Sequence, residues 1–174
     1  MGKKKGFSAL DRALDGDEEA VETVLGSVVA PLFDVAAHAL GTEALAEERC
    51  APILREIADQ LRRKALAHPE PLVAALAAFW RGAAKDCPGK NAALEPECVR
   101  FTVAERRVAL TWLAADLDGE ELDFALAIES ELRRELIDSI VHKLGGEVGE
   151  WRDRLNERAM IMMLPKGLLD FLEE

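Results

Sequence analysis

The order of apolar and polar residues along the chain predicts a protein built almost entirely from helices. Apolar residues recur every three or four positions through most of the sequence, as expected when one face of each helix is buried. Val21, Val24, Leu25 and Val28 show this spacing near the N-terminus. No segment has the strict apolar–polar alternation with β-branched residues that is typical of a strand. The predicted fold class is therefore all-α.

Start and stop signals divide the first half of the chain into four helices. Ser8, followed three residues later by Asp11, predicts a capped first helix. Pro31 lacks a backbone N–H and should kink or restart the second helix. Thr42 is a natural N-cap for the third helix. An alanine-rich fourth helix is expected over residues 72–84, after a break that contains two prolines.

The second half of the chain is expected to contain three helices and a short tail. The apolar spacing predicts a helix over residues 102–115 and one long helix from 118 or 119 to 144, where two glycines stop it. A last long helix is expected over residues 147–160. The apolar tail at residues 168–172 is interpreted as a short helix that docks on the rest of the protein.

Residues 86–100 contain two prolines and two cysteines, and they are the best candidate for a domain boundary. The chain then divides into a helical domain at residues 1–85, a linker at 86–100 and a helical domain at 101–174. The two segments would form either two small helical lobes or one helical bundle.

Charge is distributed unevenly between the two segments. The chain carries a net charge of −11 at pH 7. Residues 1–85 hold 11 Lys and Arg against 13 Asp and Glu, a net charge of −2, whereas residues 86–174 hold 11 against 20, a net charge of −9. An acidic surface repels nucleic-acid phosphates and favours basic partners, or it serves solubility alone. DNA binding is therefore disfavoured.

Neither a metal site, nor a cofactor site, nor a catalytic site is recognisable in the sequence. The histidines and cysteines are too far apart for zinc-ligand or redox-motif spacing, and no phosphate loop or nucleophile elbow is present. We therefore expect a protein that is not an enzyme, unless catalytic residues meet only in three dimensions, where a buried, perturbed acid in a pocket would reveal them. The residues considered are His38, His68, His142, Cys50, Cys87 and Cys98.

The sequence also predicts where the protein is found. The basic start of the chain is not followed by the hydrophobic stretch of a secretory signal. No apolar run approaches the roughly 20 residues that span a bilayer. We therefore expect a cytoplasmic protein without a membrane partner, in which Trp80, Trp112 and Trp151 are packing anchors.

One stretch of the first segment follows a recognisable motif order. It contains, in sequence, Gly16-Asp17, Leu32-Phe33, Leu40-Gly41 and Ala46-Glu47-Glu48, joined by an apolar helix. This order resembles the start of region 2 in extracytoplasmic-function sigma factors, and it covers residues 16–48 without a gap. The resemblance implies two small helical domains, of which the second ends in a helix-turn-helix.

The helix-turn-helix that the resemblance implies has two possible placements. In one, Leu144-Gly145 forms the turn, and Trp151, Arg152 and Arg154 lie on a degenerate DNA-recognition helix. In the other, the motif covers residues 107–128. Asp153 lies between the two arginines and opposes phosphate contacts.

Two functions follow from these patterns. The resemblance implies a non-enzymatic, transcription-related protein, either sigma-like or a sigma mimic, that binds RNA polymerase or an anti-sigma factor. Its candidate contacts are Glu47, Glu48, Arg49, Arg55 and Glu56. The alternative is an unrelated helical adaptor or small subunit of a larger complex, in which the tail at residues 168–172 is a helix-in-groove ligand.

Overall fold

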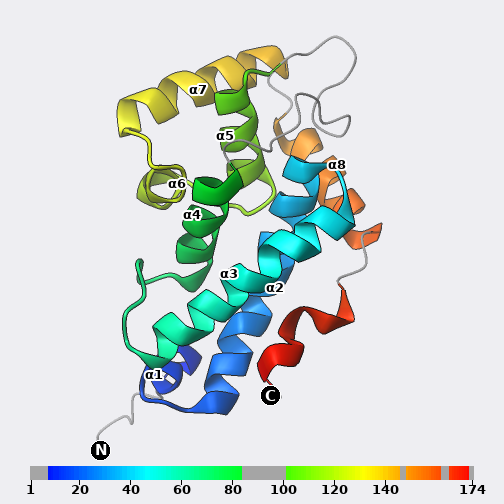
Figure 1. Ribbon diagram of the computed structural model, residues 1–174. Helices are drawn as coiled ribbons and strands as arrows, with labels where there is room; N and C mark the ends of the chain where they lie inside the picture. The colour runs from blue at the N-terminus through cyan, green and yellow to red at the C-terminus, as the bar shows by residue number, and fades with distance from the viewer. Residues whose placement is uncertain (1–7, 84–100, 146–147, 162–164, 173–174) are drawn as a thin grey trace, which may run out of the picture.

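The computed structural model describes residues 8–83, 101–145, 148–161 and 165–172, and these residues form helices and turns with no strand (Figure 1). The predicted all-α fold class is confirmed. The elements, in chain order, are α1 (Ala9–Leu14), α2 (Glu18–Leu40), α3 (Glu43–Arg62), α4 (Pro71–Ala83), α5 (Val103–Leu113), α6 (Gly119–Leu126), α7 (Ser130–Lys143), α8 (Val148–Ile161) and the 3₁₀ helix η1 (Lys166–Leu172).

The two predicted caps, at Ser8 and Thr42, form where the sequence places them, and Asp17 adds a third. Ser8 and Asp11 make a reciprocal capping box at the start of α1. Asp17 caps α2 by accepting the backbone N–H of Ala20, and Thr42 caps α3. Gly41 ends α2 with φ = 80°, a left-handed conformation that glycine adopts without steric cost.

Helix α2 is the central element of the fold, and it runs without a break through Pro31. The expected restart at Pro31 is therefore wrong. Pro31 removes one hydrogen bond, but the residues that follow it, Leu32 and Phe33, are fully buried and keep the helix packed. Burial along this face outweighs the loss of one donor.

Length and composition alone would let α2 cross a membrane, so the expectation that no apolar run is long enough is also wrong. However, 61% of its apolar window is buried inside the protein. Helix α2 packs against α1, α3, α4 and α5, as the core helix of a globular fold does.

The expected long helix over residues 118–144 is wrong, because the chain turns at Ala127. Helix α6 ends at Leu126, and α7 begins at Ser130. Ala127 adopts φ = 52° and ψ = 48°, and its N–H donates to the carbonyls of Asp123 and Phe124. A left-handed alanine is uncommon because its Cβ approaches the following carbonyl oxygen. No glycine or proline marks this turn in the sequence.

One hydrophobic core runs through both segments of the chain. Helices α4 and α6 pack against each other, and α2 contacts α5. Trp80 on α4 donates its indole N–H to the Thr111 hydroxyl on α5 at 2.9 Å, and both side chains are buried. The expected linker at residues 86–100 lies outside the described residues. The division into two domains stays a prediction, while the packing joins the segments on either side of it.

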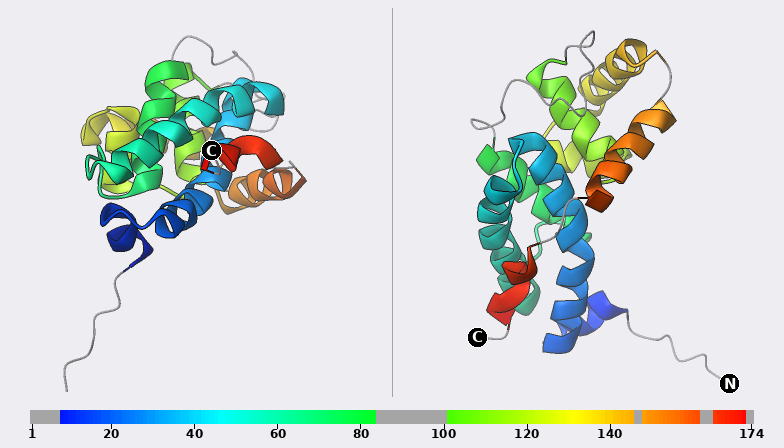
Figure 2. Two further views of the ribbon diagram at one scale, coloured as in Figure 1. Left: turned by 60° about the horizontal axis from the view of Figure 1, so that its bottom comes forward. Right: turned by 90° about the vertical axis from the view of Figure 1, so that its right-hand side faces the viewer.

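The tail forms the short docking helix that its sequence predicts. Helix η1 lies alongside α2 and α3, at the lower end of the molecule in Figure 1 and in the right-hand view of Figure 2. Leu168 is buried, and Leu169, Phe171 and Leu172 are partly buried against the core. Residues far apart in the chain therefore close one side of the α2–α3 pair.

Candidate protein-interaction surfaces

The five predicted partner contacts all lie on the outward face of α3. Glu47, Glu48, Arg49, Arg55 and Glu56 are exposed. At 3.6 residues per turn, residues seven apart lie almost in line along a helix. Glu48 therefore aligns with Arg55, and Arg49 aligns with Glu56. Two neighbouring lines of alternating charge follow the helix axis.

The buried face of α3 holds this charged face in position. Ala46, Cys50, Leu54 and Ile57 are each no more than 1% exposed. Burial raises the pKa of the Cys50 thiol to about 12, so this thiol stays protonated at neutral pH. Cys50 packs as a small apolar side chain, as the sequence predicts, while Cys87 and Cys98 lie outside the described residues.

Leu45 adds an apolar group to the α3 surface. Its side chain is 45% exposed. Leu45 is four residues before Arg49, so the two lie on the same side of the helix. Protein interfaces combine an apolar centre with a charged rim, and Leu45 gives the α3 face such a centre.

Helix η1 borders the α3 surface at Arg55. The Arg55 guanidinium carbon lies 5.5 Å from the centre of the Phe171 ring, within the range of a cation–π interaction. One turn away, Gln60 donates a hydrogen bond to the Glu56 carboxylate at 2.9 Å. Glu47 and Glu48 lie on the part of α3 farther from these contacts.

The α6–α7 pair has the form of a helix-turn-helix. An eight-residue helix is followed by Ala127, Ile128 and Glu129 and then by the 14-residue α7. Figure 1 shows α6 end-on while α7 crosses the top of the molecule, so the two helices cross steeply. Both pack on α5. The sequence placement over residues 107–128 covers part of α5 and all of α6 and ends before α7, so the helix-turn-helix that the resemblance implies stays a prediction.

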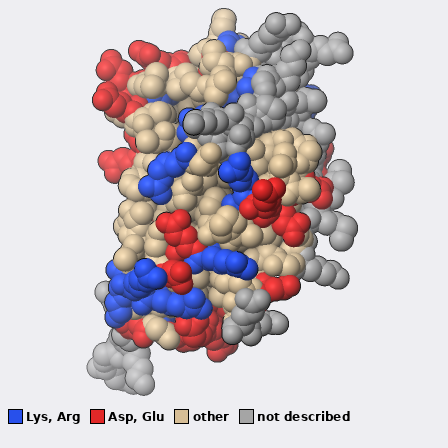
Figure 3. All heavy atoms as spheres, in the orientation of Figure 1, with Lys and Arg blue, Asp and Glu red and all other residues tan. Residues whose placement is uncertain are grey.

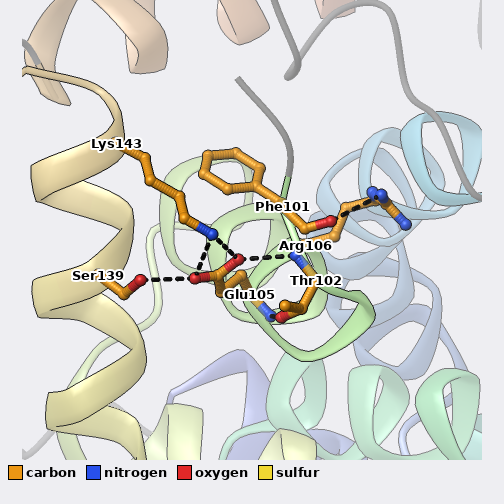
Figure 4. Close-up of polar contacts among 6 residues, drawn as sticks. All are labelled: Phe101, Thr102, Glu105, Arg106, Ser139 and Lys143. Atoms are coloured by element: carbon orange, nitrogen blue, oxygen red, sulfur yellow. Dashed lines mark hydrogen bonds and ion pairs between the residues drawn. The ribbon is translucent and has the colours of Figure 1, made fainter. Parts of the chain in front are cut away.

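A buried polar cluster fixes α7 to α5 (Figure 4). Glu105 is 4% exposed and accepts hydrogen bonds from Lys143 at 2.6 and 2.8 Å and from Ser139 at 2.6 Å. It also accepts the backbone N–H of Thr102 at 2.7 Å. Burial raises the pKa of Glu105, but these hydrogen bonds outweigh burial and lower its pKa from 4.5 to about 2. Glu105 is therefore ionised at neutral pH.

The outward face of α7 is acidic. Glu131, Glu135 and Asp138 are exposed on it, against one exposed arginine, Arg134. The neighbouring Arg133 is paired with Asp123 of α6 at 2.6 Å. In Figure 3, acidic atoms gather at the upper left, where Figure 1 shows the start of α7. The exposed face of α7 therefore presents mainly negative charge.

The other predicted recognition residues make internal contacts. Trp151 is 8% exposed, in agreement with its expected role as a packing anchor. The Arg154 guanidinium lies over its ring at 4.7 Å. Arg152 pairs with Asp116 at 3.2 Å. The contact between Arg154 and Trp151 lies within α8, and the ion pair between Arg152 and Asp116 joins α8 to the loop after α5.

Among the described residues, one carboxyl group, that of Asp34, has a pKa that is raised by burial. The described residues contain no group of three or more His, Cys, Asp or Glu side chains placed to hold a metal ion. Asp34, on α2, is partly buried, and this burial raises the pKa of its carboxyl to about 6. It does not line the cavity between α4 and α6 that is described below.

Comparisons with protein-family models, with curated proteins and with solved structures found no match to this chain. The function is therefore inferred from the α3 face, from the α6–α7 unit and from the sequence resemblance.

Proposed function

We propose that this chain is a non-enzymatic, protein-binding factor of transcription, either sigma-like or a sigma mimic, that binds RNA polymerase or an anti-sigma factor through α3. The observation that carries the proposal is the surface of α3, where Glu48 and Arg49 lie on the same side as the exposed Leu45, and Glu47 is exposed next to Glu48 on a rigidly packed helix. The proposed site of action is the cytoplasm, and no cofactor takes part.

The motif positions that suggest the resemblance have separate structural roles, which supports the proposal. Asp17 caps α2, and Gly41 ends it in a left-handed conformation. Ala46 is fully buried, whereas Glu47 and Glu48 directly after it are exposed. The buried and capping residues are needed to form the fold. The two exposed glutamates are not needed for folding, so we assign them a role in binding.

Binding of DNA through α7 is not part of the proposal. Most nucleic-acid affinity comes from Lys and Arg that neutralise phosphates. On the outward face of α7, Glu131, Glu135 and Asp138 outnumber Arg134. A duplex that approached this helix would meet like charge. The proposed activity is therefore recognition of a protein. In this proposal, the α6–α7 pair keeps the form of a helix-turn-helix but carries negative charge where a DNA-binding helix carries positive charge.

Affinity capture of the tagged protein from its own cells, with mass spectrometry at moderate salt, tests the proposal. We expect recovery of RNA polymerase or of a small anti-sigma protein. The double variant Glu47→Lys/Glu48→Lys should lose this partner, because it reverses two exposed charges without touching the core. The matched control is Glu131→Lys/Glu135→Lys, which makes the same change on α7 and should keep the partner.

Two results would contradict the proposal. One is recovery of a defined complex that lacks polymerase and anti-sigma proteins. The other is equal loss of the partner in both double variants, which would indicate a general effect of net charge rather than a site on α3.

A second candidate, a helical adaptor or small subunit of a larger complex, is favoured by a different observation. The core is shared between the two segments, with Trp80 and Thr111 hydrogen-bonded across them, as in a single bundle. Under this alternative, the acidic α7 face is the partner surface. The control variant Glu131→Lys/Glu135→Lys would then be the one that loses the captured complex.

A further inference from the structure

A cavity of about 310 Å³ opens between α4, α5 and α6, at the joint between the two segments of the chain. Its walls are mostly apolar, and they include Ala77, Trp80, Phe124 and Leu126. This volume lies at the lower end of the roughly 300–1,000 Å³ range of small-ligand sites. The cavity therefore has the size and the lining of a site for a small apolar group.

One wall of the cavity leaves a large aromatic side chain in contact with water. Phe124 is 42% exposed, and the His68 ring lies 4.8 Å from it, centre to centre. Trp80 on the opposite helix is 1% exposed, so its ring is already held in place. A ligand that enters between these helices removes apolar surface of Phe124 from water, which favours binding.

Two arginines give the cavity a positive charge. Arg107 lies with its guanidinium carbon 5.1 Å from the centre of the Trp80 ring, and it donates to the Trp80 carbonyl at 3.5 Å. Arg81 is exposed, and none of the described residues forms an ion pair with it. Guanidinium groups bind carboxylates through paired hydrogen bonds. In a protein of net charge −11, this is a local positive site beside an apolar cavity.

We propose that the cavity binds a small amphipathic carboxylate, with its apolar part against the exposed ring of Phe124 and its carboxylate at Arg81. The positive charge of Arg81 selects an anion, and the small volume selects a small molecule over a folded partner. The site differs from the α3 surface, so the inference stands whether or not the proposed function is correct.

Ligand binding here would act on the α6–α7 unit. Leu126 lines the cavity and is the last residue of α6, directly before the left-handed Ala127. A ligand that packs on Leu126 stabilises one position of α6 against α4. Leu126 and Ala127 both line the cavity, so a bound ligand contacts the end of α6 and the turn that leads into α7.

Isothermal titration calorimetry with decanoate tests the proposal, and decanol is the neutral control of equal chain length. We expect saturable binding of decanoate to the full chain. Arg81→Gln should weaken decanoate binding about tenfold and leave decanol binding unchanged, because it removes the charged hydrogen-bond donor only. Arg134→Gln is the matched control, since Arg134 is an exposed arginine on α7 that does not line the cavity.

A second variant tests the cavity itself. Ala77 is 7% exposed but lies outside the hydrophobic core cluster, so Ala77→Leu fills the cavity without entering the core. It should weaken binding of both decanoate and decanol, with circular dichroism confirming a folded chain. The proposal is overturned by absence of saturable decanoate binding up to about 1 mM. It is also overturned by decanoate binding that Arg81→Gln leaves unchanged, a result that does not depend on how Ala77→Leu folds.

Discussion

Helix α2 buries 13 of its 23 residues, whereas α7 buries only Ile140 of its 14. The first is held by apolar side chains on almost every side. The second is held mainly by polar contacts, from Glu105 to Ser139 and Lys143 and from Asp123 to Arg133. Apolar packing is insensitive to pH and to salt, while ion pairs respond to both. The acidic α7 face is therefore attached by contacts that solution conditions can weaken.

The largest expected effect on stability comes from a substitution in α2. Leu25 is 0% exposed, and Leu25→Ala should lower the free energy of unfolding by about 3–4 kcal/mol, because it removes buried methyl groups and leaves a cavity. Urea unfolding followed by circular dichroism measures the loss. Leu132→Ala, at a leucine of α7 that is 44% exposed, should change stability by less than about 0.5 kcal/mol. Similar losses in both variants would remove the contrast between the two helices.

The next effect tests the polar attachment of α7. Glu105→Gln should cost about 2–3 kcal/mol at pH 7, because the lowered pKa of Glu105 reports a stabilised carboxylate. Its folded-state pKa, about 2, lies below the ordinary 4.5, so its contribution is complete above pH 4.5 and is lost as the pH falls from 4.5 towards 2. Urea unfolding of both proteins at pH 7 and pH 3 measures this difference, which should shrink at pH 3. Glu135→Gln, on the exposed face, is the control.

Asp34, on α2, has a raised pKa, so its effect on stability changes with pH in the opposite direction to that of Glu105. Burial raises its folded-state pKa from 3.8 to about 6, so ionisation destabilises the fold, and stability is lost as the pH rises from 3.8 through 6. Asp34→Asn should therefore stabilise the protein by about 1–2 kcal/mol at pH 7 and by almost nothing at pH 3.5. Thermal unfolding at the two pH values checks this. Glu22→Gln, at an exposed position of α2, should show no such pH dependence.

The smallest expected effect concerns the turn between α6 and α7. Ala127→Gly should stabilise the protein by about 0.5–1 kcal/mol, because glycine adopts the left-handed conformation without a Cβ clash. Ala125→Gly, inside α6, should instead destabilise it by about 1 kcal/mol. Thermal unfolding of the pair distinguishes a strained turn from a general response to glycine. A loss of stability in both variants would contradict the assigned strain.

The helices with local signals were predictable from the sequence, and the α6–α7 turn was not. Ser8, Asp17 and Thr42 cap helices because their side chains bond to backbone N–H groups a few residues away. By contrast, Ala127 takes its conformation from tertiary packing of α6 on α4, and nothing in its own residue type indicates a turn. The continuity of α2 through Pro31 has the same origin, since burial of the residues that follow it, Leu32 and Phe33, overrides a local rule.

The candidate surfaces divide in the same way. The outward position of Glu48 follows from helical periodicity, because the exposed Leu45 and Arg49 share its side of α3. Periodicity alone does not place Glu47 outside, because Glu47 lies in line with the buried Cys50 and Leu54. The cavity could not be predicted, because Trp80, Arg107 and Leu126 come from three helices that meet only in the folded chain.

The docking of η1 on α2 and α3 has a consequence for synthesis of the chain. Helix α3 ends at Arg62 and η1 begins at Lys166, a separation of 104 residues. At about 5–20 residues per second, a ribosome takes about 5–20 s to make that interval. Until then, the site that Leu168 fills on the α2–α3 pair stays uncovered in the nascent chain. During that interval, the apolar side chains of the α2–α3 pair that η1 covers stay exposed to water, where chaperones can bind them until η1 emerges.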